Sequence, residues 1–261
     1  VDGYLKWLSS IAHLDFGKSF INQHPVITEI FSADKMKTSF IVAAIATVFE
    51  FLIAIPLGIT AATHQYSIRD YVITVLVLIG ISLPSFFFGQ MLKDILANKL
   101  GWLPVSGMLT PGVTLTGSAR FFDFLKHMIL PVLTVVILSI GARMRMTRTN
   151  MLEVLNSDYI RTARAKGLSE SRVIYKHAFR NTMIPLVTSL AGLIPSLFSG
   201  AMITETVFDL EGIGKFALNA MTQGDIPVIM TYNMFLAALS VLGILLSDLM
   251  YAVVDPRVKL A

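Results

Sequence analysis

The sequence contains no cysteine among its 261 residues, which excludes disulfide scaffolds, thiolate metal sites and cysteine nucleophiles together. Charge is also scarce, because Asp, Glu, Lys and Arg make up 15% of the chain, against about 25% in soluble domains. Hydrophobic residues make up 54%, and the mean hydropathy is +0.70. These figures exclude a disordered chain, and they indicate a membrane protein rather than a soluble globule.

Five apolar segments are long enough to cross a bilayer, which requires about 20 residues in a helix. They run over about 38–63, 71–92, 125–142, 183–204 and 226–254. The sequence therefore predicts an all-α polytopic membrane protein with five visible transmembrane helices. Small residues within the spans, such as Gly58 and Gly80, allow the helices to approach closely.

Two of these spans contain an acidic residue, Glu50 in the first and Asp248 near the end of the fifth. Ionisable groups inside a membrane are candidate functional residues. Two interpretations stay open for Glu50, which either lines a pathway or forms a structural pair. For Asp248, we favour a structural pair with a basic residue at the inner face.

The net charge of +4 is unevenly placed along the chain. Between Arg143 and Arg180 there are nine basic and three acidic residues, whereas residues 205–225 contain four acidic residues and one basic residue. The positive-inside rule places 143–182 in the cytoplasm and 205–225 outside. Alternation then puts residues 1–37 outside and the C-terminus inside. An external segment of this kind needs a helix to carry it across, so a sixth span before Val1 is expected. A cleaved signal peptide is the alternative.

The cytoplasmic segment has the pattern of two helices joined at a sharp corner. Ser157 and Asp158 are favourable residues for the start of a helix, and Gly167 suits a left-handed helix end. Ser169 can begin a second helix over about 170–181, followed by the span that starts near Met183. Such a unit either contacts anionic lipid or docks a cytoplasmic partner, and the pattern alone leaves both interpretations open. Three arginines before it, at 143, 145 and 148, suit contact with lipid phosphates.

Seven motifs resemble those of the permease subunits of ABC importers, more narrowly the oligopeptide/dipeptide/nickel branch. The first is Asp158-Tyr-Ile-Arg-Thr-Ala-Arg-Ala-Lys-Gly167 with His177-Ala-Phe-Arg-Asn181 and Ile184-Pro185, which resembles the family's coupling loop. The others are Leu14-Asp-Phe-Gly-Lys-Ser19, Ile81-Ser-Leu-Pro-Ser85, Gly101-Trp-Leu-Pro-Val-Ser-Gly107, Glu205-Thr-Val-Phe208 with Gly212-Ile-Gly214, Asp225-Ile-Pro-Val228, and Asp248-Leu-Met-Tyr251 with Asp255-Pro-Arg257. They follow the family's order and cover nearly the whole chain.

This resemblance implies a type I ABC importer permease fold. It divides the chain into an external segment, 1–37, and a transmembrane permease domain, 38–261, with a cytoplasmic coupling loop at 143–182. The implied partners are a second homologous permease subunit, two cytoplasmic ATP-binding subunits, an extracellular or periplasmic substrate-binding protein and membrane lipid, with no nucleic acid. This chain is expected to bind no cofactor, with ATP and Mg²⁺ held by the ATP-binding subunits.

The implied location is a bacterial or archaeal plasma membrane, which the chain crosses several times. Peptides are the implied cargo, and nickel, glutathione or another small solute such as an opine is the alternative within the same family. A channel or an intramembrane enzyme is less favoured.

The resemblance also implies which residues couple transport to ATP hydrolysis. They are Asp158, Tyr159, Arg161, Thr162, Ala163, Arg164, Ala165, Lys166 and Gly167. The two alanines are expected to give small side chains at the contact, and Gly167 is expected to form the corner. Plain helix propensity is the alternative for the alanines, and a solvated face is the alternative for the three basic residues. Arg161-Thr162-Ala163 stands where the general coupling motif begins Glu-Ala-Ala.

Glu205, Gly212 and Gly214 mark the external loop that resembles the family's late loop, on the face where a binding protein would dock. Its acidic charge suits docking, and ordinary solvation explains it equally well. Glu211 stands where the branch usually has proline.

The chain is predicted not to be an enzyme. It has no phosphate-binding loop of the Gly-x-x-x-x-Gly-Lys-[Ser/Thr] type and no His-Glu-x-x-His zinc motif. Its five histidines are scattered without the spacing of metal ligands. The energy for transport is therefore expected to come from a partner.

Overall fold

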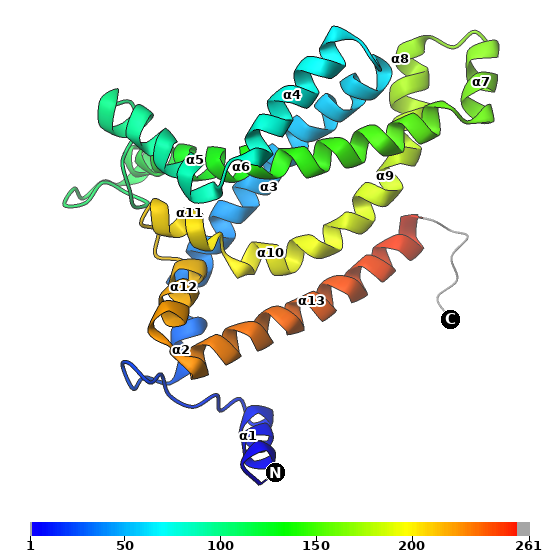
Figure 1. Ribbon diagram of the computed structural model, residues 1–261. Helices are drawn as coiled ribbons and strands as arrows, with labels where there is room; N and C mark the ends of the chain where they lie inside the picture. Colours follow the sequence, from blue (N-terminus) through cyan, green and yellow to red (C-terminus); the bar gives the residue numbers. More distant parts are fainter. Residues whose placement is uncertain (1, 255–261) are drawn as a thin grey trace. The chain divides into compact units, whose positions relative to one another are not determined.

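The computed structural model describes residues 2–254, and helices dominate it (Figure 1). The α-helices are α1 (Asp2–Ala12), α2 (Val26–Ile30), α3 (Ala33–Thr63), α4 (Ile68–Ser82), α5 (Ser85–Leu92), α6 (Gly117–Leu155), α7 (Asp158–Ala165), α8 (Glu170–Arg172), α9 (Phe179–Thr188), α10 (Leu193–Ser199), α11 (Met202–Val207), α12 (Ile213–Gln223) and α13 (Ile226–Val254). Two π-helical segments, η1 (Lys93–Lys99) and η2 (Val173–Ala178), and a 3-10 turn, η3 (Ser189–Gly192), connect some of them. Within residues 2–254, β pairing is limited to one isolated bridge between Lys18 and Pro25. The predicted all-α class is confirmed.

The described chain divides into two compact units. The first comprises residues 2–44, 89–132 and 195–241, and the second comprises 45–88, 133–194 and 242–254. Five helices, α3, α5, α6, α10 and α13, contribute residues to both units.

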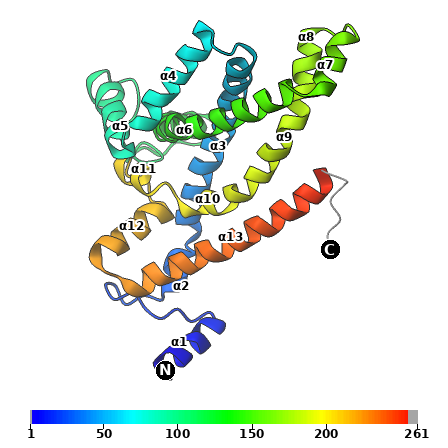
Figure 2. The same cartoon turned by 45° about the vertical axis from the view of Figure 1, so that its right-hand side comes forward.

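The core of the first unit forms where α2, α12 and the start of α13 pack together (Figure 2). Its most buried side chains are Val26, Ile30, Ile213, Ala217, Ala220, Val228 and Tyr232. The Phe31 and Phe235 rings meet edge to face at 5.1 Å between centroids, a favoured aromatic geometry. The Tyr232 hydroxyl donates to the Ser199 carbonyl at 2.6 Å, so the ring's polar end is satisfied inside the core.

The core of the second unit has two clusters. One packs the end of α3 and the end of α6 against α7 and the helical run after it, and the other joins α3, α4 and α6. At Gly58 of α3, an added Cβ would lie 2.6 Å from the Thr147 Cβ of α6, and at Gly80 it would lie 3.0 Å from the Ile137 carbonyl oxygen. The predicted close approach of helices at these two glycines is confirmed. Gly141 of α6, where an added Cβ would lie 2.5 Å from Ile81, acts in the same way.

Three helices within residues 2–254 are long and apolar enough to cross a membrane. They are Val26–Thr63, Gly117–Leu155 and Ile226–Leu249, which correspond to the first, third and fifth predicted spans. The bent pair Ile68–Ser82 and Ser85–Lys99 gives a fourth if it is counted as one span. The count of five is therefore not confirmed.

The second and fourth spans were predicted as single helices, and that prediction is wrong. The chain turns by 101° between α4 and the helix that begins at Ser85, because Pro84 disfavours helical geometry at the residue before it. Leu83 is accordingly extended, with φ −89° and ψ 134°. In the fourth segment, η3 separates α9 from α10, and residues 193–207 form only a shorter apolar helical segment.

Candidate functional site

The first half of the predicted coupling loop folds as expected. Helix α7 begins after Ser157, whose backbone is extended, and ends at Ala165. Gly167 then takes φ +74°, a conformation that glycine adopts without steric cost. Its N–H donates to the Arg164 carbonyl at 2.9 Å. The predicted helix with a left-handed glycine corner is confirmed, although the Ser157 hydroxyl donates to the Val154 carbonyl instead of capping α7.

The second half of the loop differs from the prediction. The helix begins at Glu170 as expected, but it does not stop near Asn181. Helices α8, η2 and α9 follow one another without a gap up to Thr188, since residues 179–183 contain neither glycine nor proline to end the helix. In Figures 1 and 2, α7 and α8 lie side by side, joined by the glycine corner. The predicted coupling loop is therefore continuous with the helix that follows it.

Burial divides the predicted coupling residues into two faces. Ile160 is fully buried and Ala163 is 7% exposed, and both belong to the hydrophobic cluster around Met151. The other predicted coupling residues, Asp158, Tyr159, Arg161, Thr162, Arg164, Ala165, Lys166 and Gly167, are exposed. The expectation that Ala163 presents its methyl group to a partner is therefore wrong, because this chain's own core covers it.

Side-chain contacts fix the corner from both arms. Arg164 donates to both carboxylate oxygens of Glu170, at 2.6 and 3.2 Å. This bond lowers the pKa of Glu170 and raises that of Arg164. The Asn181 amide donates to the Tyr159 hydroxyl at 2.8 Å. Arg164 thus has a partner within the loop, whereas Lys166 forms no ion pair with any residue between 2 and 254.

Two buried carboxylates of the second unit are paired with arginines of α6. Glu50 is 8% exposed and lies 3.1 Å from the Arg143 Nε, and Arg143 also donates to the Ser189 hydroxyl at 2.7 Å. Asp70 accepts two bonds from Arg148, at 2.9 and 3.1 Å. Glu50 thus forms an ion pair with Arg143, and its role in lining a pathway stays a prediction. The prediction that Arg143 and Arg148 contact lipid phosphates is wrong, because each of these arginines binds a carboxylate of this chain.

The other acidic residue predicted inside a span, Asp248, is exposed on α13. Within residues 2–254, no basic side chain forms an ion pair with it. Its predicted basic partner therefore stays a prediction, and the motif residues Asp255 and Arg257 lie outside the described residues.

In the first unit, the predicted external loop is organised around Glu205, whose side chain is fully buried. Its Oε1 accepts from the Ser39 hydroxyl at 2.6 Å and from the Ala201 N–H at 3.2 Å, and its Oε2 accepts from the Lys215 N–H at 2.9 Å. Ser39 accepts in turn from the Ile213 N–H at 2.9 Å. A buried carboxylate is tolerated when hydrogen bonds satisfy it, and here hydroxyl and backbone donors do so.

Three glycines make room for this carboxylate. A Cβ added to Gly212 would lie 2.5 Å from the Glu205 Cδ, and one added to Gly214 would lie 2.9 Å from the Met202 nitrogen. At Gly200, with φ +70°, it would lie 2.6 Å from the Gly214 nitrogen. The predicted trio of Glu205, Gly212 and Gly214 is thus brought together in space. Sequence reasoning missed Ser39, which carries no motif signal of its own.

The acidic charge of this loop is partly offset within the loop. The Lys215 ammonium lies 2.6 Å from Asp209 and also contacts Glu211. Hydrogen bonding from Lys215 lowers the pKa of Asp209. Glu211 is therefore exposed and paired at the position where the branch usually has proline. Among residues 2–254, no three His, Asp or Glu side chains gather as a metal site would require.

Comparison with known proteins identifies the family to which this fold and these motifs belong. The family described as "Binding-protein-dependent transport system inner membrane component" matches residues 54–260. The chain belongs to this family. The match contains the predicted coupling loop, the Glu205 loop and the Asp70–Arg148 pair, whereas Ser39 and Glu50 precede it.

Curated relatives align with nearly the whole chain. It is 39% identical to "Oligopeptide transport system permease protein AppB" of Bacillus subtilis, over 98% of this chain and 79% of that protein. It is 36% identical to "Dipeptide transport system permease protein DppB" of Escherichia coli K12, over 98% and 80%. It is 33% identical to "Di/tripeptide transport system permease protein DppB" of Pseudomonas aeruginosa, over 98% and 80%.

Solved structures share the fold. A chain of the MetNI methionine ABC transporter, in an inward-facing conformation, superposes with a TM-score of 0.64 over 85% of this chain and 94% of that chain. A second crystal form of the same transporter gives 0.66. The sequence identity of 15% in both makes this a likeness of fold, and the fold is that of a type I ABC importer permease.

Proposed function

We propose that this chain is one permease subunit of an ATP-driven peptide importer and forms half of the translocation pathway. The observation that carries the proposal is the alignment of peptide permeases over 98% of the chain at 33–39% identity. The nickel and glutathione alternatives are not favoured, since these relatives are named for peptides of two or more residues. The proposed partners are a second permease, two ATP-binding subunits and a substrate-binding protein.

The coupling loop is the proposed contact with the ATP-binding subunit. A docking element must be rigid, so that movement of the partner is transmitted and not absorbed. The buried Ile160 and Ala163 anchor α7 to the core, while the Arg164–Glu170 and Tyr159–Asn181 contacts hold the two arms together. Because η2 and α9 continue from α8 without a gap, a push on α7 passes directly into the next helix.

The sides of the membrane follow from the same proposal. Residues 143–182 face the cytoplasm with the C-terminus, and residues 1–37 and 205–225 face outward, in a bacterial plasma membrane. The chain supplies no ATPase site of its own, and ATP and Mg²⁺ are held by the ATP-binding subunits. The rigid Glu205 loop belongs to the face that receives the binding protein.

Reconstitution tests this function. The chain is purified with its partner permease and ATP-binding subunits, placed in proteoliposomes and supplied with binding protein and a radiolabelled tripeptide. We expect peptide accumulation that requires ATP and every subunit. Accumulation by this chain alone, or uptake of Ni²⁺ or glutathione with no uptake of peptide, would contradict the proposal.

The variant Gly167→Val tests the coupling step in the same system. A side chain at φ +74° strains the corner, although an added Cβ meets nothing within 4 Å. We expect peptide-stimulated ATP hydrolysis to fall to the unstimulated level while the complex still assembles. Gly112→Val is the matched control, because Gly112 has φ +76° and equally open surroundings in the predicted external loop. Equal effects of the two variants would remove the coupling role.

A further inference from the structure

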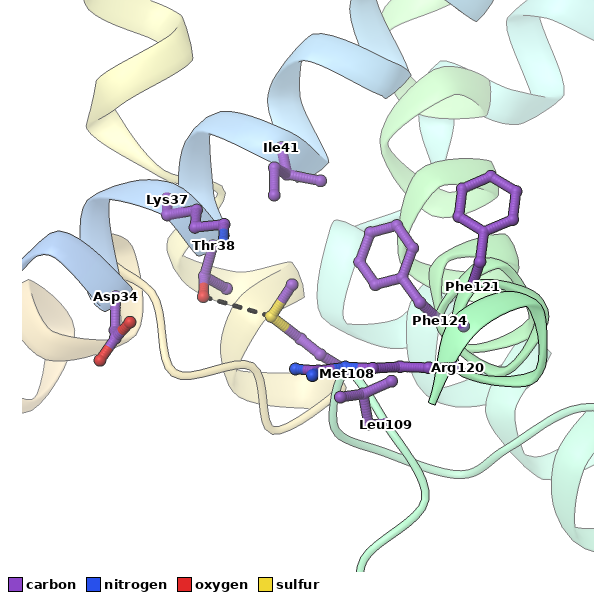
Figure 3. A pocket seen from close by; sticks show the side chains of 10 residues that line it. Asp34, Lys37, Thr38, Ile41, Met108, Leu109, Arg120, Phe121 and Phe124 are labelled. Atoms are coloured by element: carbon purple, nitrogen blue, oxygen red, sulfur yellow. Dashed lines mark hydrogen bonds between the residues drawn. The ribbon is translucent and has the colours of Figure 1, made fainter. Parts of the chain in front are cut away.

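We propose that a cavity in the first unit is a binding station for the peptide on its way into the pathway. The cavity measures about 500 Å³, within the range of small-molecule sites. It lies between the start of α3, the start of α6 and the loop at Met108 and Leu109 (Figure 3). The inference rests on the proposed function, and it names a site on this chain where the cargo is held.

The lining has the chemistry of a molecule that is charged at both ends. Asp34 and Lys37 come from α3, and Arg120 extends from α6 beside Met108 (Figure 3). All three side chains are exposed, and none forms an ion pair with another residue between 2 and 254. A carboxylate and two cations therefore face the same cavity with their charges unmatched.

Apolar groups occupy the space between these charges. Ile41 of α3, Phe121 and Phe124 of α6, and Leu109 of the loop line the cavity. Figure 3 shows the Phe124 ring in the space between α3 and α6, with Asp34 and Lys37 on the α3 side and Arg120 on the other. This arrangement suits a short peptide, whose carboxylate would bind Arg120 on one side, whose ammonium would bind Asp34 on the other, and whose side chains would contact the phenylalanines between them.

A phospholipid fits this lining less well. Its charge is confined to one end and its long chains need a continuous apolar surface, whereas the charged groups here stand on two sides of the cavity. The predicted topology also agrees with cargo that arrives from outside. Apart from Thr38 and Ile41, every lining residue belongs to segments 1–37 or 93–124, which are predicted to be external.

Photolabelling of the complete importer in proteoliposomes tests the station. The probe is a tripeptide with a central p-benzoylphenylalanine, supplied on the binding protein and illuminated during transport. We expect label in residues 34–41 or 117–124. The variant Arg120→Gln should lower this labelling roughly tenfold, the size expected when a charge-assisted hydrogen bond is lost. Lys126→Gln, an exposed lysine on the same helix outside the cavity, should leave it unchanged.

The termini of the probe give the second arm. A probe with a C-terminal amide should label the unmodified importer more weakly than the free acid, and Arg120→Gln should remove that difference. In the same way, an N-acetylated probe should label the unmodified importer more weakly than the probe with a free ammonium, and Asp34→Asn should remove that difference. Equal labelling in Arg120→Gln and Lys126→Gln would overturn the proposal. So would label found only in other subunits, or a phospholipid that co-purifies with the importer and is lost in Arg120→Gln while peptide labelling stays unchanged.

Uptake of the same peptide distinguishes a failure of the binding station from a failure of the proposed function. If ATP-driven uptake proceeds and the cavity is never labelled, the station is wrong and the proposed function stands. If no ATP-driven peptide uptake occurs, the proposed function itself fails.

Discussion

The two units hold their buried carboxylates in different ways. In the first unit, Glu205 receives only a hydroxyl and backbone N–H groups, and glycines clear the space around it. In the second unit, Glu50 and Asp70 each receive an arginine from α6. Glu205 therefore depends on close backbone approach, while the other two depend on a charged partner side chain. The first arrangement should fail when one methyl group is added, and the second when one partner is removed.

The largest effect is expected from Gly212→Ala. The new methyl group would overlap the Glu205 carboxyl carbon and would lie 2.6 Å from the Ser39 hydroxyl, and the tight loop leaves it no free direction. Overpacking of this kind costs about 3 kcal/mol, and the buried carboxylate loses donors in addition. Thermal unfolding of the purified complex measures the loss. Gly192→Ala is the control, since an added Cβ there meets nothing within 4 Å. Equal stability of the two variants would contradict the account of the loop.

A smaller loss is expected from Arg148→Met. It leaves Asp70, whose side chain is 5% exposed, without its cation. Breaking a buried ion pair costs about 3–5 kcal/mol, and the 27% exposure of the Arg148 side chain brings the expected loss to about 2 kcal/mol. Adding Asp70→Leu should restore most of it.

The control for that variant is Arg145→Met on the same helix, where no carboxylate between residues 2 and 254 pairs with the arginine. Denaturation in urea compares the stability of complexes that contain Arg148→Met, Arg148→Met with Asp70→Leu, or Arg145→Met. The ion-pair account fails if Arg148→Met and Arg145→Met unfold together, or if the double variant is weaker than Arg148→Met.

The smallest effect on stability is expected from the pair Arg164–Glu170, which is exposed, in contrast to the buried pairs of Glu50 and Asp70. Arg164 lowers the pKa of Glu170, so the folded loop favours the ionised carboxylate. The contribution of the pair to the stability of the loop is present at pH values above the pKa of Glu170 in the unfolded chain. It is lost as the pH falls through the pKa of Glu170 in the folded chain. Hydrogen exchange at Gly167 and Leu168, corrected for the intrinsic rate, should lose protection as the pH falls below the usual range of a glutamate. Arg164→Gln should remove that pH dependence, and an unchanged profile would show that the pair does not hold the corner.

Local signals were enough to predict the coupling corner. Gly167 ends the first helix through its own backbone preference, and the helices begin after Ser157 and Ser169 as predicted, although neither hydroxyl caps its helix. Which side chains of α7 are buried could not be predicted from the sequence in the same way. Ala163 and Ala165 look identical in the sequence, and only the packing of Met151 and Val173 against one of them separates the two.

Long-range contacts limited the other predictions. The Glu205 motif was visible as a spacing of glycines, but its purpose depends on Ser39, which lies 166 residues away. The arginines of α6 looked like lipid anchors until Glu50 and Asp70 were brought beside them. Hydropathy counted the second segment as one span because Pro84 changes the direction of the chain and not its composition.

The central claim is that the exposed face of α7 docks on the ATP-binding subunit, and the absence of cysteine makes it directly measurable. Ala165→Cys and Ala163→Cys place single thiols two residues apart, one exposed and one 7% exposed. Each variant is assembled with cysteine-free partner subunits, labelled with a maleimide benzophenone and illuminated. The account predicts a cross-link from residue 165 to the ATP-binding subunit and none from residue 163. A cross-link from residue 163 alone, or from neither residue in an importer that still transports peptide, would contradict it.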